Sequence, residues 1–327
     1  MKAKITDVAQ KANVSISTVS HVLNHTRFVS EETRKKVMDA VEELGYSPDA
    51  SGRTFRTGKK MMIGLVVPDI TNSVFAALIE DVDDVISKQG YNLVISNTRD
   101  CLKMEKQALR NLASGVVDGI VIASTSEDFQ TIKRQIPDKF PMIFMDRVLP
   151  DRNYDSVILD CQEATAKMLE EMIQNGFRKI GFLVGLPQIS PTYERVKVYQ
   201  QILKQYEIPE TEQYVRYIDR QKDTYDVAGE LVEAGCTAII ATNTAMTHSV
   251  LNYVEDRNLG EEIAVGGFVD SDFANRFMHR IPVVYEPMKE MGKLAGEMIV
   301  EKIEDKNRKI PVKTLTCEYD SNDFYKK

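Results

Sequence analysis

The chain has 327 residues, of which 43% are hydrophobic, and this length suffices for one large core or for two to three domains of moderate size. Residues 1–60 hold 11 Lys or Arg against 7 Asp or Glu, a net charge of +4, whereas the remaining residues carry a net charge of −11. The sequence has neither an apolar run of 18 residues nor a cationic leader with an apolar core, so we expect a soluble, cytoplasmic protein with no membrane contact. A basic head on an acidic chain favours one module that binds nucleic acid and another that does not.

Residues 5–24 predict two short helices joined by a tight turn at residues 13–15. Apolar residues at helical spacing line one face of each helix, namely Val8, Ala9, Ala12, Val19, Val22 and Leu23. The other face of the second helix carries short polar side chains suited to base edges and phosphates. This pattern is typical of a helix-turn-helix whose second helix enters the major groove, although an unrelated amphipathic hairpin is the alternative.

A third helix is predicted after Ser30, where a capping hydroxyl precedes two carboxylates. Its apolar positions are Val37, Ala40, Val41 and Leu44, and Gly45 ends it. The segment 49–60 is too polar and glycine-rich for a stable isolated helix, yet it holds four cations and Phe55. Such a composition suits a segment that folds on DNA. We therefore expect a DNA-binding domain over 1–48 and a hinge over 49–60.

From residue 61 onward, buried-strand segments alternate with amphipathic helices. The first series has strands at 62–67, 92–96, 119–123 and 142–145, with helices at 73–89 and 104–113. The second series starts with a strand at 157–159 and continues with strands at 180–184, 237–241 and 263–267, separated by helices that reach 175, 206 and 254. This rhythm predicts an α/β core over 61–327, built as two doubly wound parallel-sheet lobes with a cleft between them. The first lobe is expected over about 61–160 and 288–309, and the second over about 161–287 and 310–327.

Enzyme signatures are scarce in this sequence. It has no P-loop, no dinucleotide-binding glycine pattern, no nucleophile elbow and no H-E-x-x-H. The cysteines lack metal-ligand spacing and are most simply buried or half-buried thiols in a reducing cytoplasm, namely Cys101, Cys161, Cys236 and Cys317. We expect no enzyme activity, no metal and no cofactor.

The whole chain resembles the lactose and galactose repressor family of bacterial transcription regulators. The resemblance is carried by I-T-D-V-A, V-S-I-S-T-V-S-H-V-L-N, S-E-E-T-R, L-G-Y-S-P, I-G-L-V-V-P-D-I-T-N, V-D-G-I-V and a closing helix that begins at Pro287-Met288. The head is especially similar to the purine-repressor branch of that family. The resemblance implies a periplasmic-binding-protein type of core, a homodimer, a pseudo-palindromic double-stranded operator, a hinge helix in the minor groove, and a small cleft effector that alters operator affinity.

The resemblance also implies which residues contact DNA. By their positions in the family motifs these are Thr6, Ser15, Ile16, Ser17, Thr18, His21, Asn24, Arg27, Ala50, Arg53 and Phe55. Phe55 stands where the family usually has the leucine that wedges between base pairs, and a phenyl ring can also intercalate. Gly52 replaces the usual alanine, so the free hinge should be less ordered.

Most residues expected to contact the effector follow the carboxyl ends of the strands, where open parallel sheets bind ligands. The family resemblance implies the same role for Phe75 and for Arg195, which is expected early in a helix. The full set is Asp69, Asn72, Phe75, Arg99, Arg147, Arg195, Arg220, Asn243, Asp270 and Glu286. Any one of them could instead cap a helix or form a surface ion pair. The set departs from the family at Val269 and Thr244, which replace acids, at Glu286, where Gln is frequent, and at Arg220, where aromatic residues are common.

The family carboxylates are lost at Val269 and Thr244, and a guanidinium is gained at Arg220. These changes favour an anionic effector that Arg195 and Arg220 bind together. We therefore expect a repressor of carbohydrate catabolism genes that responds to a sugar acid such as 2-keto-3-deoxygluconate or gluconate. Alternatives are a neutral sugar, a phosphorylated sugar or a phosphoprotein partner. A further alternative is a sugar-binding protein without a regulatory role.

Overall fold

The computed structural model describes residues 3–24, 27–46, 58–147, 149, 154–209, 212–219, 222–270 and 281–324. The chain divides into two compact units, Met1–Lys60 and Met61–Lys327. Within the described ranges, no helix is both long enough and apolar enough to cross a bilayer.

The first unit is a three-helix head made of α1 (Ile5–Lys11), α2 (Ile16–Asn24) and α3 (Glu31–Glu43). Asn13 adopts a left-handed conformation with φ 53°, which allows the tight turn between α1 and α2. The predicted apolar faces form one core, whose fully buried members are Val8, Ala9, Ala12, Val19, Val22, Val37 and Ala40. Ser30 caps α3 by accepting a hydrogen bond from the Thr33 amide. The predicted helix-turn-helix head is confirmed.

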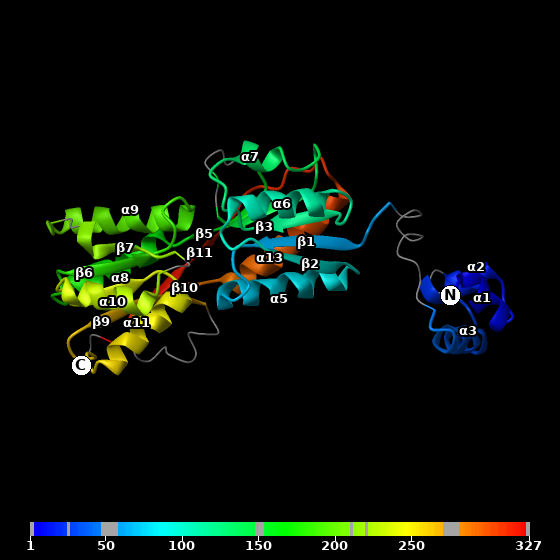
Figure 1. Ribbon diagram of the computed structural model, residues 1–327, viewed down its shortest axis with the longest axis horizontal. Coiled ribbons are helices and arrows are strands. Elements are labelled where there is room, and N and C mark those ends of the chain that lie inside the picture. Colours follow the sequence, from blue (N-terminus) through cyan, green and yellow to red (C-terminus); the bar gives the residue numbers. More distant parts are fainter. Residues whose placement is uncertain are drawn as a thin grey trace. The chain divides into compact units, whose positions relative to one another are not determined.

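The first lobe of the second unit is a parallel sheet with strand order β11-β5-β4-β3-β1-β2. Its strands are β1 (Met62–Val67), β2 (Asn92–Asn97), β3 (Gly119–Ile122), β4 (Met142–Asp146), β5 (Ser156–Asp160) and β11 (Lys313–Thr316). One face packs against α5 (Ser73–Lys88) and α13 (Met288–Glu304), and the other packs against α6 (Leu102–Ala113) and α7 (Phe129–Lys133) (Figure 1). Strands buried on both faces explain why β1 and β3 are continuous apolar runs.

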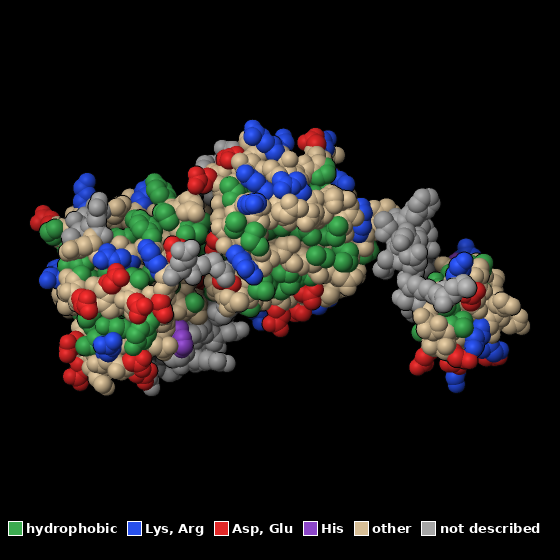
Figure 2. All heavy atoms as spheres, viewed as in Figure 1, with side chains coloured by type: hydrophobic (Ala, Val, Ile, Leu, Met, Phe, Trp, Pro, Cys, Tyr) green, Lys and Arg blue, Asp and Glu red, His purple; other side chains and the backbone are tan. Residues whose placement is uncertain are grey.

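The second lobe repeats this order as β12-β10-β9-β8-β6-β7, with only β12 antiparallel. Its strands are β6 (Ile180–Val184), β7 (Val215–Tyr217), β8 (Ala238–Ala241), β9 (Ala264–Asp270), β10 (Val283–Glu286) and β12 (Glu318–Asp320). The sheet lies between α8 (Gln162–Gln174) and α9 (Ser190–Gln205) on one face and α10 (Thr224–Glu233) and α11 (Thr244–Asp256) on the other. Figure 2 shows acidic and basic side chains mixed over the surface of α10 and α11. The prediction of two doubly wound lobes is confirmed.

One expectation about lobe membership is corrected. β5 lies in the first lobe, as the expected bounds of 61–160 have it, and pairs with β4, although its strand pattern was grouped with the second series. Residues 313–316, which we expected in the second lobe, form β11 and pair in parallel with β5. The sequence did not reveal this because β11 is a short, exposed edge strand with no apolar run.

The chain crosses between the lobes at three points. β5 leads into α8 through Cys161, β10 leads into α13 through Pro287, and β11 leads into β12 through Cys317. These crossovers lie at the carboxyl ends of first-lobe or second-lobe strands, beside the cleft.

Candidate functional site

The exposed face of α2 is the candidate DNA-reading surface. Thr6, Ser15, Ser17 and Ile16 are exposed, and Ile16 retains 49% of its accessible surface. The Ser15 hydroxyl accepts from the Thr18 amide at 3.1 Å and lies 2.7 Å from the Ser17 hydroxyl, so it caps α2. Hydroxyl groups beside a bare aliphatic side chain can contact polar base edges and a thymine methyl group.

The remaining predicted DNA contacts differ in how the structure places them. Thr18 and His21 are half-buried on α2, and Arg27 is exposed. The Asn24 side chain and the hinge residues lie outside the described part of the chain, so those assignments stay predictions, namely Asn24, Ala50, Arg53 and Phe55. Sequence reasoning overlooked Phe28, which is 97% exposed next to Arg27.

A cleft separates the two lobes. Its wide part has a volume of about 940 Å³ and is lined from the first lobe by Asp69, Asn72, Phe75, Arg99, Asp100 and Arg147, and from the second by Asp219, Lys222, Asp223 and Asn243, among others. A narrower inner part of about 90 Å³ adds Asp146, Arg195, Thr242 and Glu286. The structure therefore brings most of the predicted effector residues to one cleft. The Arg220 residue and the Asp270 side chain are outside the described part, although the Asp270 backbone pairs with Glu286 at the end of β9.

Arg147 dominates the first-lobe wall. It is 6% exposed, and its Nη1 atom donates to Asp100 Oδ1 at 2.6 Å and lies 3.4 Å from Thr125 Oγ1. Its Nε is buried and has no hydrogen-bond acceptor among the described residues. Both Arg99 and Asp100 adopt the left-handed conformation, with φ 54° and 53°. This unusual backbone turns the Asp100 carboxylate toward Arg147, and strain of this kind is commonest at functional sites.

Buried acids support the same wall. Glu105 on α6 is fully buried, and its carboxylate accepts hydrogen bonds from the Ser124 hydroxyl at 2.8 Å and the Thr125 amide at 2.6 Å. Burial raises the pKa of Glu105, although these two hydrogen bonds oppose the shift. Burial also raises the pKa of Asp146, against the opposing influence of Arg147 and Arg195. These acids hold the loop after β3 and the end of β4 in place.

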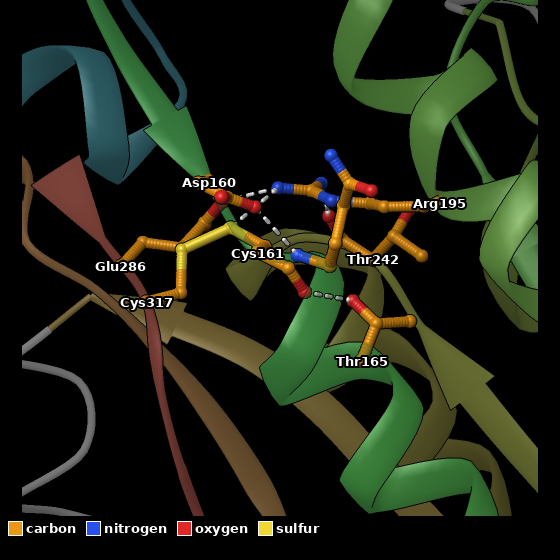
Figure 3. Close-up of a disulfide and its surroundings, with 8 residues drawn as sticks. Asp160, Cys161, Thr165, Arg195, Thr242, Glu286 and Cys317 are labelled. Carbon is orange, nitrogen blue, oxygen red and sulfur yellow. Dashed lines mark hydrogen bonds and ion pairs between the residues drawn. A yellow bond between two sulfur atoms is a disulfide. The ribbon is translucent and has the colours of Figure 1, made fainter. Parts of the chain in front are cut away.

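Arg195, on α9, dominates the second-lobe wall. Its Nη1 donates to the Thr242 carbonyl at 2.6 Å, its Nη2 lies 2.5 Å from Glu286 Oε1, and its guanidinium stacks 4.4 Å from the Phe268 ring centroid. Figure 3 shows Arg195 and Glu286 meeting beside Cys161. We predicted that Arg195 and Arg220 bind one anion together. In the structure Arg195 is paired with Glu286, and Arg220 lies outside the described residues, so the joint site stays a prediction.

Several predicted effector residues also have structural roles. The Asn72 side chain caps α5 by accepting from the Val74 amide, and the Asn243 side chain caps α11 by accepting from the Met246 amide. Asp69 Oδ1 accepts from both the amide and the hydroxyl of Thr71. Asn72 and Asn243 both line the cleft, and each carboxamide still has an amino group that can donate, so capping and ligand binding are compatible.

The cysteine expectation is partly wrong. Cys161 and Cys317 form a disulfide across 156 residues of sequence, because the pairing of β11 with β5 brings them together. Cys101 and Cys236 are free thiols, and burial raises the pKa of Cys236 to about 11. In the described ranges, no three His, Cys, Asp or Glu side chains gather as a metal site.

Sequence reasoning missed Asp100 and Thr242 as cleft residues. Asp100 directly follows Arg99 at the end of β2, so its position could have suggested a role. Thr242 contributes a backbone carbonyl to Arg195, and a backbone contact leaves no signal in residue type. Thr242 could not have been found from the sequence.

Two family models match this chain. The model of bacterial regulatory proteins of the lacI family matches residues 4–49, and that of periplasmic binding proteins and the sugar binding domain of the LacI family matches residues 60–323. The HTH-type transcriptional repressor PurR of Vibrio atlanticus (strain LGP32) is 31% identical over 313 residues, which cover 93% of each chain. The probable HTH-type transcriptional regulator EndR of Paenibacillus polymyxa is 29% identical over 316 residues, 94% of this chain and 93% of its own.

Solved structures share the fold. The lac repressor dimer bound to operator and the anti-inducer ONPF matches with a TM-score of 0.82 at 20% identity, and 99% of each chain is covered. The complex of the transcriptional regulator CelR with cellobiose matches with a TM-score of 0.69 at 21% identity over 98% of each chain. Together with the family models and the PurR relative, the architecture shows that this chain belongs to the lacI family of bacterial regulatory proteins and is a DNA-binding transcriptional repressor rather than an enzyme.

Proposed function

We propose that this repressor controls carbohydrate catabolism genes and that a sugar acid in the cleft sets its affinity for the operator. It acts as a homodimer on a pseudo-palindromic operator, and the matching lac repressor structure, a dimer bound to operator, supports the dimeric part of this proposal. Its site of action is the cytoplasm, where the operator lies. A compound such as gluconate or 2-keto-3-deoxygluconate combines one carboxylate with several hydroxyl groups, which is the chemistry that the cleft walls offer.

The incomplete pairing of Arg147 carries this proposal. Arg147 is nearly buried, yet its side-chain hydrogen bonds to described residues run through Nη1, and its Nε lies 4.0 Å from Asp146 Oδ2 without a hydrogen-bond acceptor among those residues. Arg147 lines both parts of the cleft, and a guanidinium has five N–H donors, so it retains donors beyond those on Nη1. A carboxylate that binds the two terminal guanidinium nitrogens would form a bidentate pair. The sugar hydroxyls would then face Asp69, Asn72 and Asn243 on the two walls.

Calorimetry with purified full-length protein tests the effector class. Gluconate and 2-keto-3-deoxygluconate should bind, while glucose should bind at least tenfold more weakly because it has no carboxylate for Arg147. Arg147→Gln should lower gluconate affinity tenfold or more, the scale of one charge-assisted hydrogen bond of about 1.5–3 kcal/mol. Arg110→Gln, on α6 and bonded to Gln107 and Gln135, is the matched control and should leave binding unchanged. Tight binding of glucose with no response to either acid would end the proposal.

A neutral sugar is the second candidate, and the Arg195–Glu286 pair favours it. This pair places no net charge on the inner cleft, and its oxygens and nitrogens can hydrogen-bond to hydroxyl groups. The same calorimetry distinguishes the candidates, because a neutral effector would bind equally well to wild type and Arg147→Gln.

The DNA side of the proposal assigns base preference to α2. Ser17 and His21 would read bases, while the cations of α3 would not, since Lys36 pairs with Glu32 at 2.6 Å and Arg34 lies 3.8 Å from Glu31. Binding-site selection from random DNA should yield a different preferred operator for Ser17→Ala. A uniform loss of affinity with the same preferred operator would contradict the assignment.

A further inference from the structure

Two of the three crossovers between the lobes carry a cysteine. Cys161 lies between β5 and α8, Cys317 lies between β11 and β12, and the disulfide joins them. The third crossover, at Pro287, has no thiol. A covalent bond between two crossovers limits how far they can move relative to each other when one lobe rotates against the other.

The sheet itself holds the two cysteines side by side. Thr316 pairs with Asp160, and the Cys317 amide donates to the Asp160 carbonyl at 2.9 Å. The two Cα atoms are 4.8 Å apart, within the usual range for a disulfide. Because backbone pairing sets this separation, the two sulfur atoms stay close enough to react again after the bond is reduced.

We propose that Cys161 and Cys317 are a reversible modification site, a redox latch on the hinge that small disulfide compounds close and small thiols open. The Cys161 thiolate attacks one sulfur of a disulfide RSSR, which forms a mixed disulfide and releases RS⁻. The Cys317 thiolate then attacks the Cys161 sulfur, which forms the Cys161–Cys317 bond and releases the second RS⁻. The two cysteines lose two electrons and two protons, and RSSR becomes two RSH.

The surroundings of Cys161 suit it to the first attack. Cys161 is 7% exposed and lines a hollow of about 20 Å³ together with Asp146, Ser190 and Arg195, so a disulfide reagent reaches it only when this part of the cleft widens. Arg195 Nη2 lies 3.9 Å from this sulfur, and Cys161 is the N-cap of α8. Arg195 shares its charge with Glu286, and the helix N-terminus adds a second positive influence, so both favour the thiolate, which is the reactive form. Disulfides in reducing compartments are usually transient and redox-sensing.

The latch is physically continuous with the effector site. Arg195 contacts Cys161 at the first crossover and Glu286 just before the third, so one cluster connects all three crossovers (Figure 3). Reduction restores a thiol group next to Arg195. It also removes the covalent bond between the crossover at Cys161 and the crossover at Cys317. The consequence for effector binding rests on the proposed function, whereas the latch itself does not.

Full-length protein without DNA or effector tests the latch. The protein is equilibrated in buffers of reduced and oxidised glutathione, the remaining thiols are alkylated, and mass spectrometry measures the Cys161–Cys317 linkage. We expect the linked fraction to rise in one two-electron transition and to fall again when reduced glutathione is restored. Hydrogen–deuterium exchange of the Cys317 amide should be at least tenfold slower in the linked form, because its bond to Asp160 then opens less often.

Variants identify the residues responsible. Cys161→Ser and Cys317→Ser should each abolish the linkage and the redox dependence of exchange, and Cys236→Ser, which alters a buried free thiol, should preserve both. Glutathione adducts without the internal linkage, or equal exchange rates in the two redox states of the wild type, would overturn the proposal. The wild-type comparison decides the matter even if a variant fails to fold. Since no effector is used, a failure of the sugar-acid proposal would leave these results unaffected.

Discussion

The two walls of the cleft each present one nearly buried arginine, but they connect it to different parts of the molecule. Arg147 bonds only to first-lobe groups in the contacts described above, Asp100 and Thr125, which follow β2 and β3. Arg195 bonds to Thr242 in its own lobe and also contacts Glu286 and Cys161 at the crossovers. In these interactions, Arg147 therefore contacts only its own lobe, whereas Arg195 also contacts residues at the crossovers between the lobes. We infer that the first wall governs affinity and the second couples the cleft to lobe movement.

The pair of Arg195 and Glu286 should give the largest effect when broken. Their side chains are 11% and 6% exposed, so removal of one partner leaves a buried charge without compensation. Glu286→Leu should lower the free energy of unfolding by about 3–5 kcal/mol, measured by urea denaturation. The double variant Arg195→Met with Glu286→Leu removes both charges and should recover most of the loss. If the double variant is as unstable as the single one, the charge explanation is wrong.

A smaller loss is expected from the first wall. Asp100→Asn keeps an oxygen that can accept from Arg147 but removes the negative charge, so the stability loss should be about 1.5 kcal/mol in the same urea experiment. Asp138→Asn, at an exposed position, serves as the control and should change stability by less than about 0.5 kcal/mol. If Asp100→Asn lowered the free energy of unfolding as much as Glu286→Leu does, the two walls would not differ in the way described.

The sequence predicted the parts of this protein that repeat a simple pattern. Helical spacing of Val8, Ala12, Val19 and Val22 was enough for the head, and continuous apolar runs were enough for β1 and β6, whose bounds agree with the structure. β11 was not predicted because most of its residues are exposed and it contains no apolar run. Only its pairing with β5 defines it as a strand.

The sequence predicted which residues lie at the cleft, but it did not predict which side chains pair with one another there. Strand ends indicated Asn72 and Arg147, since ligands bind at the carboxyl edge of a parallel sheet, and the family resemblance indicated Arg195. The sequence could not show that Glu286 would neutralise Arg195, because 91 residues separate them. The disulfide was missed for the same reason.

The smallest effect concerns Glu105, which lies behind the first wall. Its pKa is raised in the folded protein, so the stability that its protonated form contributes is fully present below the ordinary pKa of Glu and is lost as the pH rises through the raised value. Glu105→Gln keeps a group that can bond to Ser124 and Thr125 and should match the wild type within about 1 kcal/mol at pH 4. From pH 4 to pH 8 the wild type should lose stability relative to the variant in thermal denaturation. Parallel pH profiles would show that Glu105 does not titrate as described.

Hydrogen–deuterium exchange at the Cys317 amide tests the central claim, that only the second wall is coupled to the hinge. This amide bonds to Asp160 between two crossovers, so it reports their opening. The comparison uses the reduced form of two conservative variants, Glu286→Gln in the second wall and Asp100→Asn in the first. The account predicts exchange at least fivefold faster in Glu286→Gln and unchanged in Asp100→Asn. Equal changes in both variants, or a change in Asp100→Asn alone, would contradict it.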